Sequence, residues 1–186
     1  MKSILVFCFL LTIGAGYHQG QQSGKEKAVE IKPESTLKET TDWLKEKLES
    51  AAGYHQDDGY KSNTCKIQDV YFQNCSLTFR ETRITKLNMR TFMDASVRSA
   101  LVLSNIDPSK ITVAVISGVP TVKIPTVEGK KTIKNDLDIA LPSRREKTIS
   151  TTSELELPFE DQDTAERVAK AFAHAVNLCK GKKEPS

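Results

Sequence analysis

The sequence predicts an exported α+β protein in which a run of antiparallel strands lies between two helices. Three observations support this prediction: a helical period near the N-terminus, short alternating segments in the middle and a long amphipathic segment at the C-terminus. Because no helical pattern separates the strand segments, we expect an antiparallel sheet or barrel of about seven strands.

The N-terminus is typical of a secretory signal peptide. Lys2 precedes an apolar run that starts at residues 4–11, and Gly14-Ala15-Gly16 supplies small residues for cleavage. The run is shorter than the roughly 20 apolar residues that span a bilayer. We therefore predict a signal peptide at residues 1–16, export to the periplasm or the exterior, and no stable membrane insertion.

Polar segments flank the predicted domain. Residues 17–34 are rich in Gln, Gly, Lys and Ser without an apolar period, which predicts a disordered leader. Residues 182–186 form a polar tail. We therefore expect a single domain over residues 35–181.

Composition and charge are those of an ordinary globular protein. Of the 186 residues, 38% are hydrophobic and 27% are charged, and the formal net charge is +3. Basic residues alternate with acidic ones, as in residues 45–47 and 144–147. A nucleic-acid-binding protein usually carries a continuous basic surface, so we expect no nucleic-acid partner.

The first helix is predicted over residues 36–52. Thr36 can cap it, and Glu39 stands at the position of a capping-box partner. Gly53 is suited to ending the helix. Helical spacing places one set of residues on a single face: Leu37, Thr41, Leu44, Leu48 and Ala51.

Short strands are predicted between residues 64 and 157. Apolar and polar residues alternate in most of the segments, as in half-buried strands, and turn residues such as Gln73-Asn74 and Asp107-Pro108 separate them. The predicted segments are residues 65–72, 75–80, 87–91, 97–103, 111–116, 122–124, 137–141 and 148–157.

The C-terminal helix is predicted from about Asp161 to Gly181. Asp161 and Asp163 at its start and Lys180 at its end suit the helix dipole. Its apolar stripe consists of Ala165, Val168, Phe172, Ala175, Val176 and Cys179.

This order of elements resembles the pleckstrin-homology-like barrel. Residues 153–159 followed by residues 163–179 resemble its last strand and helix, and residues 165–172 with Leu178-Cys179 also resemble uncharacterised exported bacterial proteins. The resemblance extends over residues 35–181 as an order of elements and is specific at the C-terminus. It implies a barrel whose open end the last helix plugs, with a cystatin-like helix on a sheet as the alternative.

The resemblance also bears on lipid binding. Members of that family that bind phosphoinositides use basic residues in the loop between the first two strands. The corresponding turn here, Gln73-Asn74, has no cation. We therefore do not expect recognition of a lipid headgroup in that loop.

Three cysteines remain after removal of the predicted signal peptide. In an oxidising compartment at least one disulfide is expected. With a turn at Gln73-Asn74, Cys65 and Cys75 lie roughly 20–30 Å apart along a hairpin, at about 3.3 Å per residue. Cys75 shares the phase of Leu77, and Cys179 lies on the apolar stripe. We predict a Cys75–Cys179 bridge, with buried reduced thiols as the alternative.

The candidate chemical groups do not form a recognisable site. The spacing within residues 55–59, which include His55, Asp57 and Asp58, matches neither a calcium loop nor a zinc pattern. His174 lies on the second face of its helix, and Asp136 and Asp138 are a local pair. Because no nucleophile elbow, phosphate loop or metalloprotease motif is present, we predict no catalytic residue, metal site or cofactor.

The leading functional hypothesis is an exported, non-enzymatic module that binds a protein or peptide through an exposed sheet edge or groove. A carrier of a small apolar ligand in the barrel interior is the first alternative, which a pocket of roughly 300–1,000 Å³ would support. An enzyme is the second alternative. It would need His55 or His174 to face a cleft beside a second ionisable group.

Overall fold

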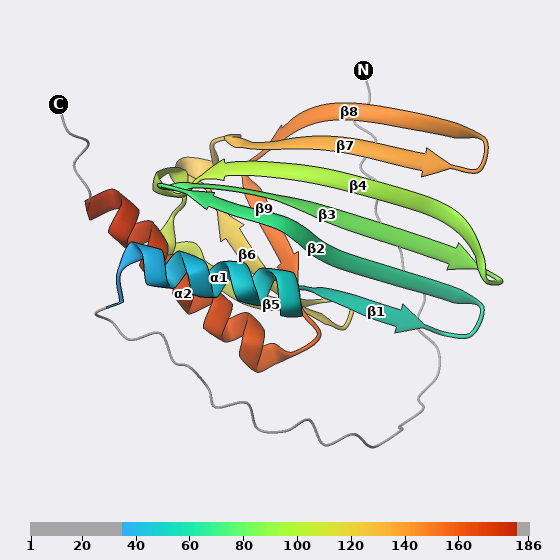
Figure 1. Cartoon of the computed structure of the whole chain (residues 1–186), viewed down its shortest axis with the longest axis horizontal. Helices are drawn as coiled ribbons and strands as arrows, with labels where there is room; N and C mark the ends of the chain where they lie inside the picture. Colours follow the sequence, from blue (N-terminus) through green and yellow to red (C-terminus); the bar gives the residue numbers. More distant parts are fainter. Residues whose placement is uncertain (1–34, 182–186) are drawn as a thin grey trace. The chain divides into compact units, whose positions relative to one another are not determined.

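A computed structural model describes residues 35–181 (Figure 1). The predicted signal peptide, leader and tail lie outside these residues. Two helices flank nine strands, as the sequence predicted for an α+β protein. The helices and strands are α1 Leu37–Ala51, β1 Gly53–Asp57, β2 Lys61–Gln73, β3 Ser76–Leu87, β4 Arg90–Val102, β5 Thr112–Ile116, β6 Val119–Pro125, β7 Ile133–Leu141, β8 Arg144–Thr152, β9 Glu154–Pro158 and α2 Gln162–Gly181.

The strands form two antiparallel sheets. The larger has six strands in the order β1-β2-β3-β4-β7-β8, and the smaller has three in the order β5-β6-β9. A bridge between Ala52 and Phe159 brings the start of β1 beside the end of β9. Among the described residues the sheets do not close into the expected barrel, because β8 and β5 have no strand on their outer sides.

The first helix begins where the sequence predicted. The Thr36 hydroxyl accepts a hydrogen bond from the Glu39 amide, and the Glu39 carboxylate accepts one from the Thr36 amide. Leu44 and Leu48 are fully buried. The following Gly53 has φ +133°, and the first residue after the helix, Ala52, is extended. The helix therefore ends directly in β1.

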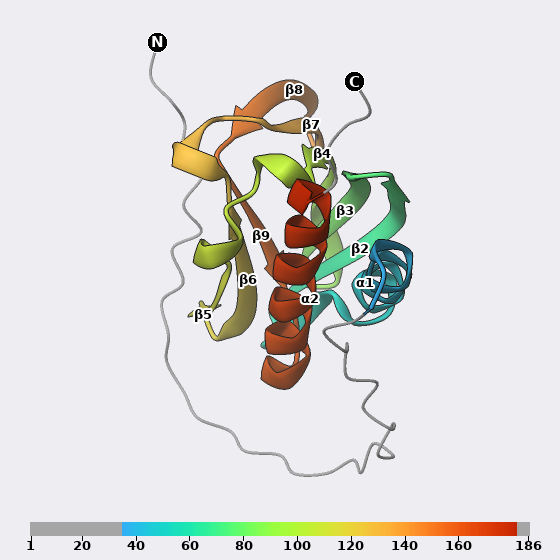
Figure 2. The same cartoon turned by 90° about the vertical axis from the view of Figure 1, so that its left-hand side faces the viewer.

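The second helix packs against α1 and the smaller sheet (Figure 2). Its small residues allow this close packing, because Ala165, Ala171 and Ala175 are all buried. Phe172 on the same stripe contributes a fully buried ring to the core. The core thus lies between α2, α1, the smaller sheet and the adjoining half of the larger sheet.

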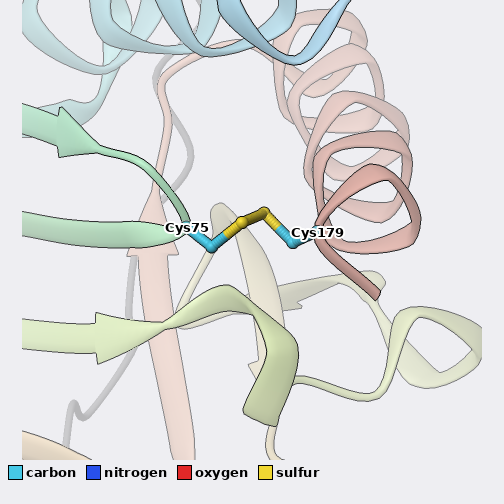
Figure 3. Close-up of a disulfide and its surroundings, with 2 residues drawn as sticks. All are labelled: Cys75 and Cys179. Atoms are coloured by element: carbon cyan, nitrogen blue, oxygen red, sulfur yellow. A yellow bond between two sulfur atoms is a disulfide. The ribbon is translucent and has the colours of Figure 1, made fainter. Parts of the chain in front are cut away.

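The predicted disulfide is present. Cys75 and Cys179 are bonded, with their Cα atoms 5.7 Å apart (Figure 3). The bond joins the turn between β2 and β3 to the last turn of α2. The turn itself lies at Asn74-Cys75, one residue later than predicted, because Asn74 adopts a left-handed φ of 53° and Gln73 pairs with Ser76.

Three segments differ from the sequence-based prediction. Residues 55–59, which lie before the predicted strands, belong mostly to β1. Residues 87–91, expected as a strand, contain a hairpin turn in which Asn88 and Met89 have left-handed φ. Residues 148–157, expected as one strand, divide at Ser153 into β8 of the larger sheet and β9 of the smaller sheet.

Candidate functional site

The two histidines that the enzyme hypothesis requires, His55 and His174, each form a hydrogen bond with a different part of the protein. The His55 Nδ1 atom lies 2.9 Å from the Thr64 hydroxyl on the neighbouring strand. The His174 Nε2 atom lies 3.0 Å from the Ser35 carbonyl oxygen beside α1. The structure therefore does not bring these two residues together, and each has a local partner.

The candidate carboxylates also serve local roles. Asp57 accepts a hydrogen bond from the Gly59 amide. Asp58 accepts hydrogen bonds from the Tyr60 and Lys61 amides, and these bonds order the β1–β2 turn. Asp138 binds Arg145 through two contacts of 2.7 Å, and this pairing lowers the pKa of Asp138. Within residues 35–181 no three His, Cys, Asp or Glu side chains are grouped to hold a metal ion.

A free edge of the larger sheet lies along β8. This nine-residue strand pairs with β7, and no strand among residues 35–181 covers its other side. Every residue from Arg144 to Thr151 is exposed. The first four residues are charged, whereas Thr148–Thr152 carries no charge and includes Ile149, which is 82% exposed. Charged side chains commonly protect a free edge, so the second half of β8 is its unprotected part.

The register indicates which β8 backbone groups face outward. Residues 142–143 form a two-residue turn closed by the pair Leu141–Arg144. In a hairpin with such a turn the closing pair is hydrogen-bonded, and hydrogen-bonded and non-bonded pairs then alternate. Ile149 pairs with Asp136 at a non-bonded position. Its amide and carbonyl, like those of Thr151, therefore point away from β7.

A groove adjoins this edge on one face of the larger sheet. It has a volume of about 360 Å³. The larger sheet forms its floor, and β9 forms one wall. Ser150 and Thr152 of β8 line it, so the groove and the free edge form one continuous surface. The other lining residues are Glu81, Arg83, Val97, Ser99, Asn135, Leu137, Glu154, Leu155 and Glu156.

An ion pair lies at the floor of the groove, in which the Glu81 side chain is buried and the Arg83 side chain is half exposed. The Arg83 guanidinium donates to the Glu81 carboxylate at 2.5 Å, and the Cys65 thiol donates to the same carboxylate at 3.1 Å. Burial and then the charge of Glu81 raise the pKa of the Cys65 thiol far above its ordinary value. Cys65 is thus a buried, protonated thiol, and it is not among the residues that line the groove.

A second cleft lies between α1 and the end of β2. Its volume is about 410 Å³, and Lys38, Lys45 and Asn74 are among its lining residues. The Lys45 ammonium lies 5.5 Å from the centre of the exposed Tyr71 ring. Neither histidine discussed above lines this cleft or the groove.

The interior between the helices and the sheets is occupied by buried apolar side chains. Phe79, Phe159 and Phe172 are among the fully buried residues of one continuous core cluster. This packing gives no support to a ligand carried in the barrel interior. None of the helices in the described residues is long and apolar enough to cross a membrane.

Comparisons with protein-family models, curated proteins and solved structures find no match to this chain. The sequence predicted an exposed edge or groove but not its location. The signal that was available is the run of six uncharged residues, 148–153, after the charged Arg144–Lys147 segment.

Proposed function

We propose that the protein is an exported, non-enzymatic binding module that captures an extended protein or peptide segment as an added strand beside β8. The observation that supports this most directly is the free edge at Thr148–Thr152. There, outward-facing backbone groups at Ile149 and Thr151 have no strand beside them in the described residues. Main-chain hydrogen bonds supply much of the affinity in this type of recognition.

The surrounding side chains suggest what the added strand contains. Ile149 alternates with Ser150 and therefore lies on the face opposite the groove, where a β-branched or aromatic residue beside it adds cross-strand contact. Ser150 and Thr152 line the groove, so the alternate residues of the partner face a hydroxyl-rich and acidic surface that includes Glu154. Arg145 and Lys147 lie on the same face as Ile149, and both pair with Asp138 of β7. Because two cations share one carboxylate, the net positive charge favours an acidic residue farther along the partner.

The test uses selection from a library of random linear peptides of roughly twelve residues against the mature protein. We expect enriched peptides to alternate β-branched or aromatic residues with polar ones. The Ile149→Pro variant removes the outward amide but no bond to β7, since proline is tolerated on the solvent side of an edge strand. It should weaken the binding of a selected peptide by about tenfold or more.

Ile149→Thr is the matched control, because it keeps the amide and a β-branched side chain. Its affinity should remain within about threefold of the unchanged protein. Equal binding by Ile149→Pro, or enrichment of no peptide, would contradict strand addition at β8. The wider assignment of the fold as pleckstrin-homology-like, or alternatively cystatin-like, remains a prediction alongside this proposal.

A further inference from the structure

A second surface lies at the end of the larger sheet away from the helices. The β1–β2, β3–β4 and β7–β8 hairpin turns all lie at this end (Figure 1). Three large apolar side chains are exposed on the first two turns: Met89 is 94% exposed, Tyr60 is 61% exposed and Phe92 is 49% exposed. The Asn88 amide donates to the Tyr60 carbonyl at 2.9 Å. The first two turns therefore lie side by side, and we call this surface the tip patch.

The backbone of Met89 adopts a left-handed conformation that is unfavourable for a residue other than glycine. It has φ 63° at the second position of a two-residue turn, where glycine or asparagine is usual. Because its side chain is almost fully exposed, it gains no packing energy in return. Non-glycine residues held in such conformations cluster at functional sites. The side chain thus has no structural role that accounts for its presence.

A β-bulge in β4 also exposes the Phe92 side chain. Thr85 pairs with Met93 and Lys86 pairs with Thr91, so Phe92 is the extra residue of a β-bulge. A bulge of this kind changes the direction of a side chain relative to the regular strand. The turn and the bulge together present two apolar side chains to solvent at the same hairpin end.

Basic side chains surround the tip patch. The three turns, taken as residues 57–61, 86–92 and 141–146, contain five basic and three acidic residues. Lys86 and Arg90 make no ion pair with any described residue. The acidic residues of the first turn accept hydrogen bonds from its own backbone amides, as described above. The surface is therefore apolar at its projecting points and positive around them.

We infer that the tip patch docks peripherally on a lipid bilayer that carries anionic headgroups. Apolar side chains on projecting turns can enter the boundary between headgroups and acyl chains, while Lys86 and Arg90 remain with the phosphates. Tyrosine, here Tyr60, is enriched at the level of the headgroups. The positive charge around the apolar points favours an anionic bilayer over an uncharged apolar partner. This inference does not rest on strand addition at β8.

The test is vesicle flotation of the mature protein. Vesicles of phosphatidylcholine with about 30% phosphatidylglycerol should bind it at low salt, and vesicles of phosphatidylcholine alone should bind it about tenfold more weakly. The double variant Met89→Ser with Phe92→Ser should reduce binding to the anionic vesicles by about tenfold or more. The double variant Lys86→Gln with Arg90→Gln should reduce both the binding and its dependence on salt.

Val115→Ser is the control, because Val115 is an exposed apolar residue on β5 of the smaller sheet. Its binding should match that of the unchanged protein. Met89→Trp provides a second measurement: indole fluorescence should shift to the blue on anionic vesicles and be quenched by lipids brominated on the acyl chains. Absence of vesicle binding, or binding that the tip variants do not alter, overturns the inference. So does self-association in sedimentation that Met89→Ser abolishes, since the tip patch would then join two copies of the chain.

Discussion

At the scale of single residues, Gly53 is the position where a side chain is least tolerable. Its φ is +133°, and an added Cβ would lie 2.3 Å from the Cys65 carbonyl oxygen. That oxygen belongs to the backbone of β2, which cannot move without disturbing the β1–β2 pairing. We expect Gly53→Ala to lower the free energy of unfolding by about 2–3 kcal/mol, measured by urea denaturation.

Gly118 provides a comparison that separates the effect of positive φ from the effect of the close contact with Cys65. It has φ +80°, but nothing lies within 4 Å of an added Cβ. Gly118→Ala therefore tests backbone conformation alone and should cost about 1 kcal/mol. Equal losses for the two variants would show that the contact with Cys65 contributes nothing.

The Cys65 thiol makes stability depend on alkaline pH. Its folded-state pKa is raised by burial and by Glu81, whereas an exposed thiol in the unfolded chain ionises near pH 8.5. The unfolded chain therefore loses a proton that the folded protein retains. The stabilising effect is complete below about pH 8.5 and falls as pH rises, by up to about 1.4 kcal/mol per pH unit.

Cys65→Ala provides the comparison for that pH dependence. Urea denaturation between about pH 8 and pH 10 should show a steeper fall for the unchanged protein than for the variant. The same burial predicts that a thiol reagent modifies Cys65 in the unfolded protein and not in the folded one near neutral pH. Parallel pH profiles for the two proteins would contradict the raised pKa.

At the scale of elements, the disulfide fastens α2 to the larger sheet. It closes a loop with a sequence separation of 104 residues, and a loop of this length corresponds to about 4–5 kcal/mol in the chain-entropy treatment. Replacing Cys75 and Cys179 together by alanine should lower the free energy of unfolding by about 2–5 kcal/mol. Urea denaturation of the variant measures the loss. A variant as stable as the unchanged protein would show that core packing alone holds α2.

The elements that the sequence predicted well are those with local signals. The capping box of Thr36 and Glu39 is complete within one turn of helix, so it is visible in the sequence and present in the structure. The C-terminal helix has an uninterrupted apolar stripe, and it begins within one residue of the prediction. The disulfide was predictable because strand phase and helix stripe both place their cysteines toward the core.

The strands were harder to predict, because the alternation of apolar and polar residues does not show where the chain turns or passes to another sheet. Leu87, Met89 and Thr91 alternate with polar residues, yet the chain reverses at Asn88-Met89 without the glycine that usually indicates a hairpin. Residues 150–154 are all polar, so no change of pattern indicates Ser153, where the chain passes from one sheet to the other. The location of the free edge follows from this passage, and the uncharged run after Lys147 does not by itself show that β8 is the last strand of its sheet.

At the scale of the whole molecule, the larger sheet is stabilised unevenly along its strands. In β3, Leu77 and Phe79 are buried in the core, whereas Lys86 near the turn is exposed. Both ends of β3 pair with β2 and β4, so pairing alone does not distinguish them. Because buried apolar contacts set the free energy of local opening, the amides of residues 84–88 should exchange about tenfold or more faster than those of residues 76–80. Amide hydrogen exchange read by mass spectrometry measures this, and uniform rates along β3 would contradict it.

The same measurement distinguishes the two proposed surfaces in one molecule. A peptide selected on the protein would turn β8 from an edge strand into an interior strand, so outward amides such as that of Ile149 should become protected. Anionic vesicles should instead protect the turns that carry Tyr60 and Met89, where the exposed side chains and free cations lie. Since β8 begins at the same end of the sheet as these turns, protection must be resolved within β8. Protection of Thr148–Thr152 by peptide but not by vesicles would show that the two surfaces act separately.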